Sequence, residues 1–237
     1  MDLHVHTCLS PCADDRMVPS RIITQAKKAR LDVLGISDHN SSRNVPAVAE
    51  VGRKEGITVF GGMEITSKEE IHVLAFFADH ESLMKMQDLI DRNLPGKNDP
   101  ESLGEQWIVD SWDALAGVDD RLLLGATGLS IERIIDTVHR FHGIAVASHV
   151  DRPAFSITSQ LGFIPPDLPL DAVEVSRRAD WTEAEFQECG YPLVRFSDAH
   201  FLEDIGVATT DFLLEEPTLG ELKKALMCSE NREIRLS

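Results

Sequence analysis

Short runs of apolar and β-branched residues recur along the chain, separated by longer stretches in which apolar residues follow a helical spacing. The short runs predict strands and the longer stretches predict amphipathic helices. The predicted strands cover residues 31–37, 57–62, 71–77, 143–149, 170–176 and 191–197. The predicted helices cover residues 20–29, 45–55, 81–92, 130–141 and 218–227. This alternation is typical of an α/β architecture.

Residues 93–128 interrupt the alternation. The segment holds two of the three tryptophans, Trp107 and Trp112, and we expect it to contain one or two helices. A chain of 237 residues is long enough to form one α/β barrel and does not require a second domain. We therefore predict a single barrel domain over residues 1–237, with a helical insertion at 93–128. The insertion either covers the site as a lid or has a structural role alone.

The composition is that of a globular protein, with 43% hydrophobic and 27% charged residues. No apolar run approaches the roughly 18 residues that a membrane-spanning helix needs. The N-terminus carries neither a basic leader nor an apolar signal core. We therefore expect a cytoplasmic protein with no membrane partner, and we expect its four cysteines to be reduced thiols.

The formal net charge of the chain is −17. Affinity for a long nucleic acid depends on Lys and Arg side chains that neutralise phosphates. The charge therefore predicts that no long nucleic acid is a partner. A small phosphorylated substrate is compatible with an acidic chain, provided that metal cations supply local positive charge.

A further strand is expected at the start of the chain, where His4 and His6 alternate with Leu3 and Val5. Six of the nine histidines lie on this strand or at the ends of the other predicted strands: His4, His6, His39, His72, His149 and His200. Three carboxylates occupy the same kind of position: Asp38, Glu64 and Asp198. The carboxyl ends of the strands meet at one face of an α/β barrel, so residues far apart in sequence converge there. A buried cluster of imidazoles and carboxylates is costly unless cations satisfy it. The pattern therefore predicts a metal centre at this face.

The motifs HVHTCLSPCAD, GISDHN, GGMEIT, IHVLAFF, ASHVDRP and FSDAH occur in this order along nearly the whole chain. With them the sequence resembles the PHP (polymerase and histidinol phosphatase) phosphoesterases. The resemblance implies a distorted seven-fold β/α barrel with the metal centre at the C-terminal ends of the strands. It also implies a metal-dependent phosphoric ester hydrolase that uses two to three divalent ions.

The resemblance further implies three groups of metal ligands. One ion is held by His4, His6, Glu64 and Asp198. A second is held by the bridging Glu64 with His72 and His149. A third involves His39 and His200, and many members complete it with an aspartate or histidine soon after the first histidine pair. Here the local sequence is SPCADD; we choose Asp14, with Asp15 and Cys12 as the alternatives.

Ions with histidine and carboxylate ligands lower the pKa of a bridging water and polarise a phosphoryl oxygen. We therefore expect a metal-bridging hydroxide to attack a small phosphoester, either a phosphomonoester or a nucleotide-like compound. Zn²⁺, Mn²⁺ and Fe²⁺ all suit these ligands. Asp38 is expected to orient an imidazole or a water, or else only to form a turn. Arg152 is expected to bind the substrate phosphate, or else to form a salt bridge with Asp151 or a loop acid.

Two other functional classes share some of these features. Amidohydrolase-type C–N hydrolases also begin with a strand-borne HxH motif, but a carboxylated lysine often bridges their metals. No lysine lies between Lys97 and Lys223, and Glu64 fills the bridging position better. The other alternative is a non-catalytic, metal-bound regulatory module.

Overall fold

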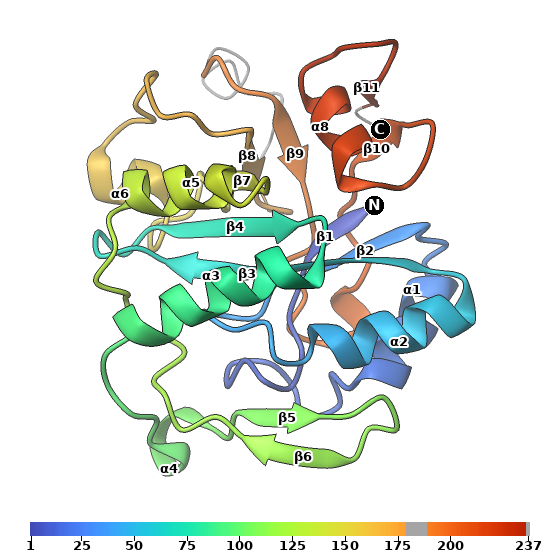
Figure 1. Cartoon of the computed structure of the whole chain (residues 1–237), viewed down its shortest axis with the longest axis vertical. Helices are drawn as coiled ribbons and strands as arrows, with labels where there is room; N and C mark the ends of the chain where they lie inside the picture. The colour runs from blue at the N-terminus through green and yellow to red at the C-terminus, as the bar shows by residue number, and fades with distance from the viewer. Residues whose placement is uncertain (179–188, 236–237) are drawn as a thin grey trace.

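The computed structural model describes residues 1–178 and 189–235, and its centre is a seven-stranded sheet (Figure 1). The strands, in their spatial order, are β1 (Asp2–Val5), β2 (Val33–Ile36), β3 (Thr58–Thr66), β4 (His72–Phe77), β7 (Ile144–Ala147), β8 (Ala172–Val175) and β9 (Leu193–Arg195). Neighbouring strands are parallel except at β4, which runs antiparallel to both β3 and β7.

The sheet curls into a nearly closed barrel. Just beyond β9, Ala199 forms a parallel bridge with Val5 of β1. His6 N donates to Ala199 O at 3.0 Å, and Ala199 N donates to His4 O at 3.0 Å. These bonds bring the two ends of the sheet together and confirm the predicted α/β barrel.

The predicted helices form at the expected places. The longer ones are α1 (Pro19–Lys28), α2 (Val45–Glu55), α3 (His80–Asn93), α5 (Ile131–Arg140) and α8 (Leu219–Leu226), and α6 (Ile157–Leu161) is shorter. In α5, Ser130 caps the first turn by accepting a hydrogen bond from Arg133 N, and Ile131, Ile134, Ile135 and Val138 are buried on one face. Figure 1 shows α3 and α5 lying against the β3, β4 and β7 part of the sheet, which they contact. No helix among the described residues is long and apolar enough to cross a bilayer.

The segment 93–128 contains less helix than expected and a ribbon of two strands that was not expected. Its only helix is α4 (Pro100–Leu103), and an antiparallel ribbon of β5 (Trp107–Val109) and β6 (Leu115–Val118) follows. The Asp110 carboxylate accepts hydrogen bonds from Trp112 N and Ala114 N, which forms the turn between these strands. The side chain of Asn44 holds the ribbon, because it donates to Trp107 O and accepts from Val109 N.

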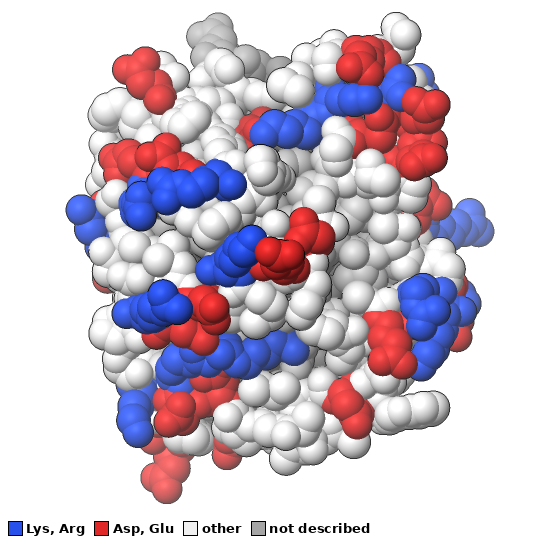
Figure 2. Space-filling view, in the orientation of Figure 1, with Lys and Arg blue, Asp and Glu red and all other residues white. Residues whose placement is uncertain are grey.

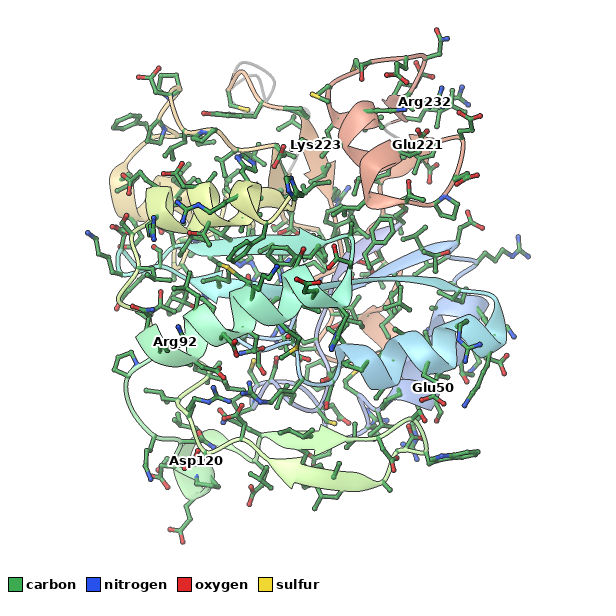
Figure 3. All side chains as sticks on the ribbon, viewed as in Figure 1. Glu50, Arg92, Asp120, Glu221, Lys223 and Arg232 are labelled. Carbon is green, nitrogen blue, oxygen red and sulfur yellow. The ribbon has the colours of Figure 1, made fainter. Side chains whose placement is uncertain are left out.

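One core cluster gathers apolar residues from all seven strands of the sheet. It includes the fully buried Phe76 and Phe196, and α8 adds Leu219, Leu222 and Leu226 to it. A second small ribbon, of β10 (Asp211–Leu213) and β11 (Glu233–Arg235), flanks α8. Arg232 ties the two together by donating to Glu221 of α8 at 2.6 Å (Figure 3).

The inward face of the strands changes from apolar to polar towards one end of the barrel. On β3, Phe60 and Glu64 share a face, since alternate residues of a strand point the same way. On β4, Phe76 belongs to the apolar cluster, and His72 lies on the same face at the start of the strand. Because β4 is antiparallel, its first residue lies at the end of the barrel where β3 finishes.

Candidate metal centre

Six histidines from different parts of the chain meet at this polar end of the barrel. The ring centroids of His6 and His200 are 4.2 Å apart, and those of His4 and His6 are 5.2 Å apart. His72 and His149 lie 5.4 Å apart, and His39 lies 4.6 Å from His6. The predicted convergence of strand-end histidines is therefore present in the structure.

Glu64 lies at the centre of the cluster, buried, with both oxygens facing imidazole nitrogens. Its Oε1 contacts His72 Nδ1 at 2.9 Å and lies 3.3 Å from the Nε2 atoms of His4 and His149. Its Oε2 lies 3.0 Å from His39 Nδ1 and 3.5 Å from His6 Nε2. Burial by itself raises the pKa of Glu64, but the facing imidazoles of His72, His4 and His39 hold it well below its usual value. The geometry suits a carboxylate that bridges two ions.

Asp198 supplies a second carboxylate from the loop after β9. Its Oδ1 lies 3.2 Å from His4 Nε2 and 3.3 Å from His6 Nε2. Asp198 and His149 have positive backbone φ values of 49° and 28°, which residues other than glycine rarely adopt. Backbone strain of this kind collects at functional sites.

These side chains fit divalent metal ions. The Nε2 atoms of His4 and His6, the Nδ1 atoms of His39 and His72, and Glu64 Oε1 are buried and have no hydrogen-bond partner. Buried polar atoms without partners are costly, and cations would satisfy all of them. Three groups have ligand atoms within 4.8 Å of one another: His4, His6 and Glu64; His39, Glu64 and His72; and His6, His39 and His200. Nitrogen and carboxylate donors suit Zn²⁺, Mn²⁺ and Fe²⁺.

Glu174 of β8 contacts the cluster, and the sequence analysis did not single it out. It is fully buried, and its two oxygens accept from His4 Nδ1 at 2.9 and 3.0 Å. Its Oε2 also accepts from His149 N at 3.1 Å. With the His4 proton held on Nδ1, the Nε2 lone pair faces Glu64 and Asp198. The sequence does hold a signal for Glu174, because it is a carboxylate between two apolar neighbours within a predicted strand.

Asp38 is linked to the cluster by hydrogen bonds through Ser10 and touches no imidazole nitrogen. It is fully buried and accepts from Thr7 N, Thr7 Oγ1 and Ser10 Oγ at 2.7, 2.8 and 2.7 Å. Burial raises the pKa of Asp38, and these hydrogen bonds oppose the rise. Because the single Ser10 proton goes to Asp38, His6 Nδ1 must donate to Ser10 Oγ at 3.0 Å. His6 therefore also presents a free Nε2.

Arg152 lies at a cavity of about 260 Å³ that opens onto the cluster. Its NH2 forms an ion pair with Asp198 Oδ2 at 2.5 Å. Asp151 is not its partner, because that carboxylate accepts from Ser176 N and Oγ. Phe155, also in the cavity wall, stacks on His72 with ring centroids 4.8 Å apart.

The three candidates for the third ligand lie in different surroundings. The Asp14 carboxylate accepts from Arg16 Nε at 2.8 Å, and this contact lowers the pKa of Asp14. Asp15 lines a separate cleft with Arg16. Cys12 lines the cavity together with His39 and His200. Desolvation alone raises the pKa of the Cys12 thiol, but these histidines lower it to about 6.

Comparisons with known proteins agree with this geometry. A family model for the PHP domain matches residues 2–188. The 5′-3′ exoribonuclease Rnm of Salmonella typhimurium is 25% identical over 194 residues, which are 64% of this chain and 65% of that protein. The lesion-specific endonuclease PfuEndoQ from Pyrococcus furiosus has a TM-score of 0.72 at 19% identity, over 99% of this chain and 57% of that one.

A further solved structure is Endonuclease Q in complex with a 27-mer duplex substrate. It has a TM-score of 0.68 at 18% identity, over 98% of this chain and 57% of that one. This chain thus spans 65% of the length of the curated relative and 57% of the two endonuclease structures.

These relatives overturn one expectation. The prediction of a small phosphorylated partner, with no long nucleic acid, is wrong, because the curated relative is an exoribonuclease and one of the similar solved structures is a complex with a 27-mer duplex substrate. The net charge sums the whole surface, whereas binding depends on the local charge along the path of the substrate. Figure 2 shows Lys and Arg side chains interspersed with Asp and Glu on one face of the molecule. Metal cations and Arg152 would add positive charge at the site itself.

Proposed function

The chain belongs to the PHP domain family, and from this premise we propose that it hydrolyses phosphoester bonds of nucleic acid at the end of a strand. The observation that carries the proposal is the small cavity at which the imidazole and carboxylate cluster meets Arg152 and Phe155. The exoribonuclease relative supports a substrate with a free end.

The size of the cavity favours a strand end over the interior of a duplex. Its volume of about 260 Å³ is just below the roughly 300–1,000 Å³ of pockets that enclose drug-sized ligands. This is room for a phosphate and part of its nucleoside. A base-paired duplex does not enter such a space, whereas a single strand can place one phosphate there.

We assign the metal ligands to the chain's own cluster. His4, His6, Glu64 and Asp198 would hold one ion, and Glu64, His72 and His149 a second. When bound, such ions act as Lewis acids that activate water and polarise a phosphoryl oxygen. Glu174 and Ser10 keep the protons of His4 and His6 on Nδ1, so that the Nε2 lone pairs remain available.

Arg152 and Phe155 would position the substrate. Arg152 uses one nitrogen for Asp198, and its guanidinium has further N–H donors for a phosphate. Phe155 is 41% exposed and offers an apolar face to a base or sugar. His72 N donates to Phe155 O at 3.0 Å, which fixes this loop against the start of β4.

The test compares linear and circular single-stranded oligonucleotides, of RNA and of DNA, with metal-loaded protein. We expect the linear strands to be shortened from one end and the circles to resist. Cleavage of circles at the same rate would overturn the proposed action at strand ends. Turnover of amide or deaminase substrates, with no phosphoester cleavage, would overturn the proposal as a whole.

A further inference from the structure

The segment 93–128 reaches the cavity at the histidine cluster through one residue. Of the described residues that line this cavity, Leu124 is the one that comes from the segment. Its side chain is partly exposed, whereas the neighbouring Leu123 is fully buried. The segment therefore adds an apolar surface to a cavity whose other walls carry imidazoles, carboxylates and Arg152.

The side chain of Asn40 fixes the turn that carries Leu124. Its Nδ2 group donates to Leu123 O at 2.8 Å and to Gly125 O at 2.9 Å, so it holds the carbonyl groups on both sides of Leu124. Its Oδ1 accepts from Thr66 N at 3.1 Å. Asn40 is fully buried, and both ends of its amide are hydrogen-bonded, as a buried amide requires.

Asn40 also joins this turn to the strand that carries Glu64. Asn40 N donates to Glu64 O at 2.8 Å. A second connection lies close by, because Thr127 N and Oγ1 donate to Thr66 O at 2.9 and 2.8 Å. These bonds hold Leu124 at a fixed place beside the cluster, as part of a wall and not as a lid that opens.

Phe155 brings a second apolar side chain to the cavity from a different element. It is attached at the start of β4, where His72 N donates to Phe155 O, whereas the turn with Leu124 is attached beside the ends of β2 and β3. In a nucleotide, the phosphate is charged and the sugar carries polar oxygens, so the face of the base is the part that apolar side chains suit. Arg152 in the same cavity is placed to bind the phosphate.

From this arrangement we infer that Leu124 is a specificity-determining residue, which contacts the base of the terminal nucleotide, and that Asn40 is a positioning residue, which holds Leu124 there. The inference rests on the proposed function, because it names the part of the substrate that this wall recognises. A leucine side chain has no hydrogen-bond donor or acceptor. The contact therefore detects that a terminal base is present and does not distinguish one base from another.

The test combines removal of the Leu124 side chain with removal of the terminal bases. Internally labelled single strands with phosphorothioate linkages carry either bases throughout or an abasic residue at each end, and their binding to metal-loaded protein is measured by fluorescence anisotropy. We expect Leu124→Ala to bind the strand with terminal bases about three- to tenfold more weakly, which corresponds to losing roughly half of the burial of a leucine. We expect wild type and Leu124→Ala to bind the abasic-ended strand equally, because the lost contact is then absent from both.

Leu122→Ala is the matched control, since Leu122 lies in the same turn and outside the cavity. It should keep the wild-type preference for terminal bases. Equal weakening of both strands by Leu124→Ala, or a wild type that binds both strands equally, overturns the inference. The measurement needs no cleavage, so failure of the proposed hydrolysis is seen separately, in the linear and circular strands.

Two variants test the positioning role of Asn40. Asn40→Asp keeps an acceptor for Thr66 N but turns a carboxylate oxygen towards two carbonyl oxygens, and Asn40→Gly removes the side chain while suiting the φ of 49°. Both should lose the preference for terminal bases, with metal content and melting temperature recorded alongside. Asn98→Asp is the control, because Asn98 donates to Gly104 O in the same segment, outside the cavity. A full preference in the Asn40 variants, or its loss only together with metal, overturns the positioning role.

Discussion

Replacing Glu174 with glutamine tests whether a buried carboxylate behind the cluster sets its affinity for metal. Glu174 accepts from His4 Nδ1 and from His149 N. Glutamine keeps the shape but has only one acceptor oxygen, so its NH2 group would face one of these two donors. His4 can relieve the conflict by moving its proton to Nε2, which removes the lone pair that faces Glu64 and Asp198.

The expected loss of metal affinity in Glu174→Gln is about 10- to 100-fold, as for other groups that orient metal-bound histidines. This corresponds to about 1.4–2.7 kcal/mol of binding free energy. The measurement is competition with a chromophoric chelator for Zn²⁺ at fixed pH, with the melting temperature of the metal-free protein recorded alongside.

Asp171→Asn is the matched control for Glu174→Gln. Asp171 also accepts from a histidine ring, His139 Nε2 at 2.7 Å, and from a backbone amide, Ala145 N at 2.9 Å. This pair lies outside the metal cluster, so the control should keep wild-type affinity. If Glu174→Gln bound Zn²⁺ as tightly as wild type, or no more weakly than Asp171→Asn, the orienting role would be refuted.

Three further predictions concern catalysis and stability. Arg152→Ala should lower kcat/KM for a labelled oligonucleotide by an amount equivalent to about 2–4 kcal/mol, and Arg152→Lys should recover part of this loss. The control is Arg177→Ala, which breaks an ion pair with Asp204 outside the cavity and should leave kcat/KM nearly unchanged. Equal losses in Arg152→Ala and Arg177→Ala would contradict the assignment of Arg152 to substrate binding. Removing metal with a chelator should abolish hydrolysis, and Zn²⁺, Mn²⁺ or Fe²⁺ should restore it; full activity in metal-free protein would be the contrary result. Gly35→Ala should destabilise the fold by about 1–3 kcal/mol in urea unfolding, since a Cβ there would lie 2.6 Å from Leu3 Cα, and an unchanged midpoint would show that β1 shifts freely.

Much of the fold follows from hydrophobic patterning, and the exceptions have local causes. The predicted strand at residues 31–37 contains β2, and the predicted helix at 130–141 contains α5 with its Ser130 cap. The ribbon in the segment 93–128 was missed because the apolar runs of its strands have only three and four residues, whereas the runs that predicted the strands of the sheet have six or seven. Such short runs carry too little periodicity to separate strand from helix. The Asp110 turn was the stronger local signal.

The candidate site, like the fold, could be predicted from the sequence only in part. Histidines and carboxylates at strand ends could be gathered from sequence, because barrel topology brings those ends together. Glu174 was missed because it lies inside a strand, where no motif marks it and only the inward direction of its side chain gives it a role. The direction of the Asp14 carboxylate depends on a contact with Arg16 two residues away, which spacing alone does not reveal.

The direction of β4 links the fold to the site more closely than any single motif. Strand direction leaves no trace in hydrophobic patterning, so the sequence analysis grouped His72 with residues at the carboxyl ends of strands, although His72 stands at the beginning of its predicted strand, residues 71–77. At about 3.3 Å per residue, the two ends of this six-residue strand lie about 17 Å apart. Had β4 run parallel to β3, His72 would lie at the opposite end of the barrel, beyond reach of Glu64. The antiparallel pairing of Thr66 with His72 instead places the imidazole 2.9 Å from Glu64 Oε1. The reversal of one strand is therefore a condition for the second group of ligands to exist.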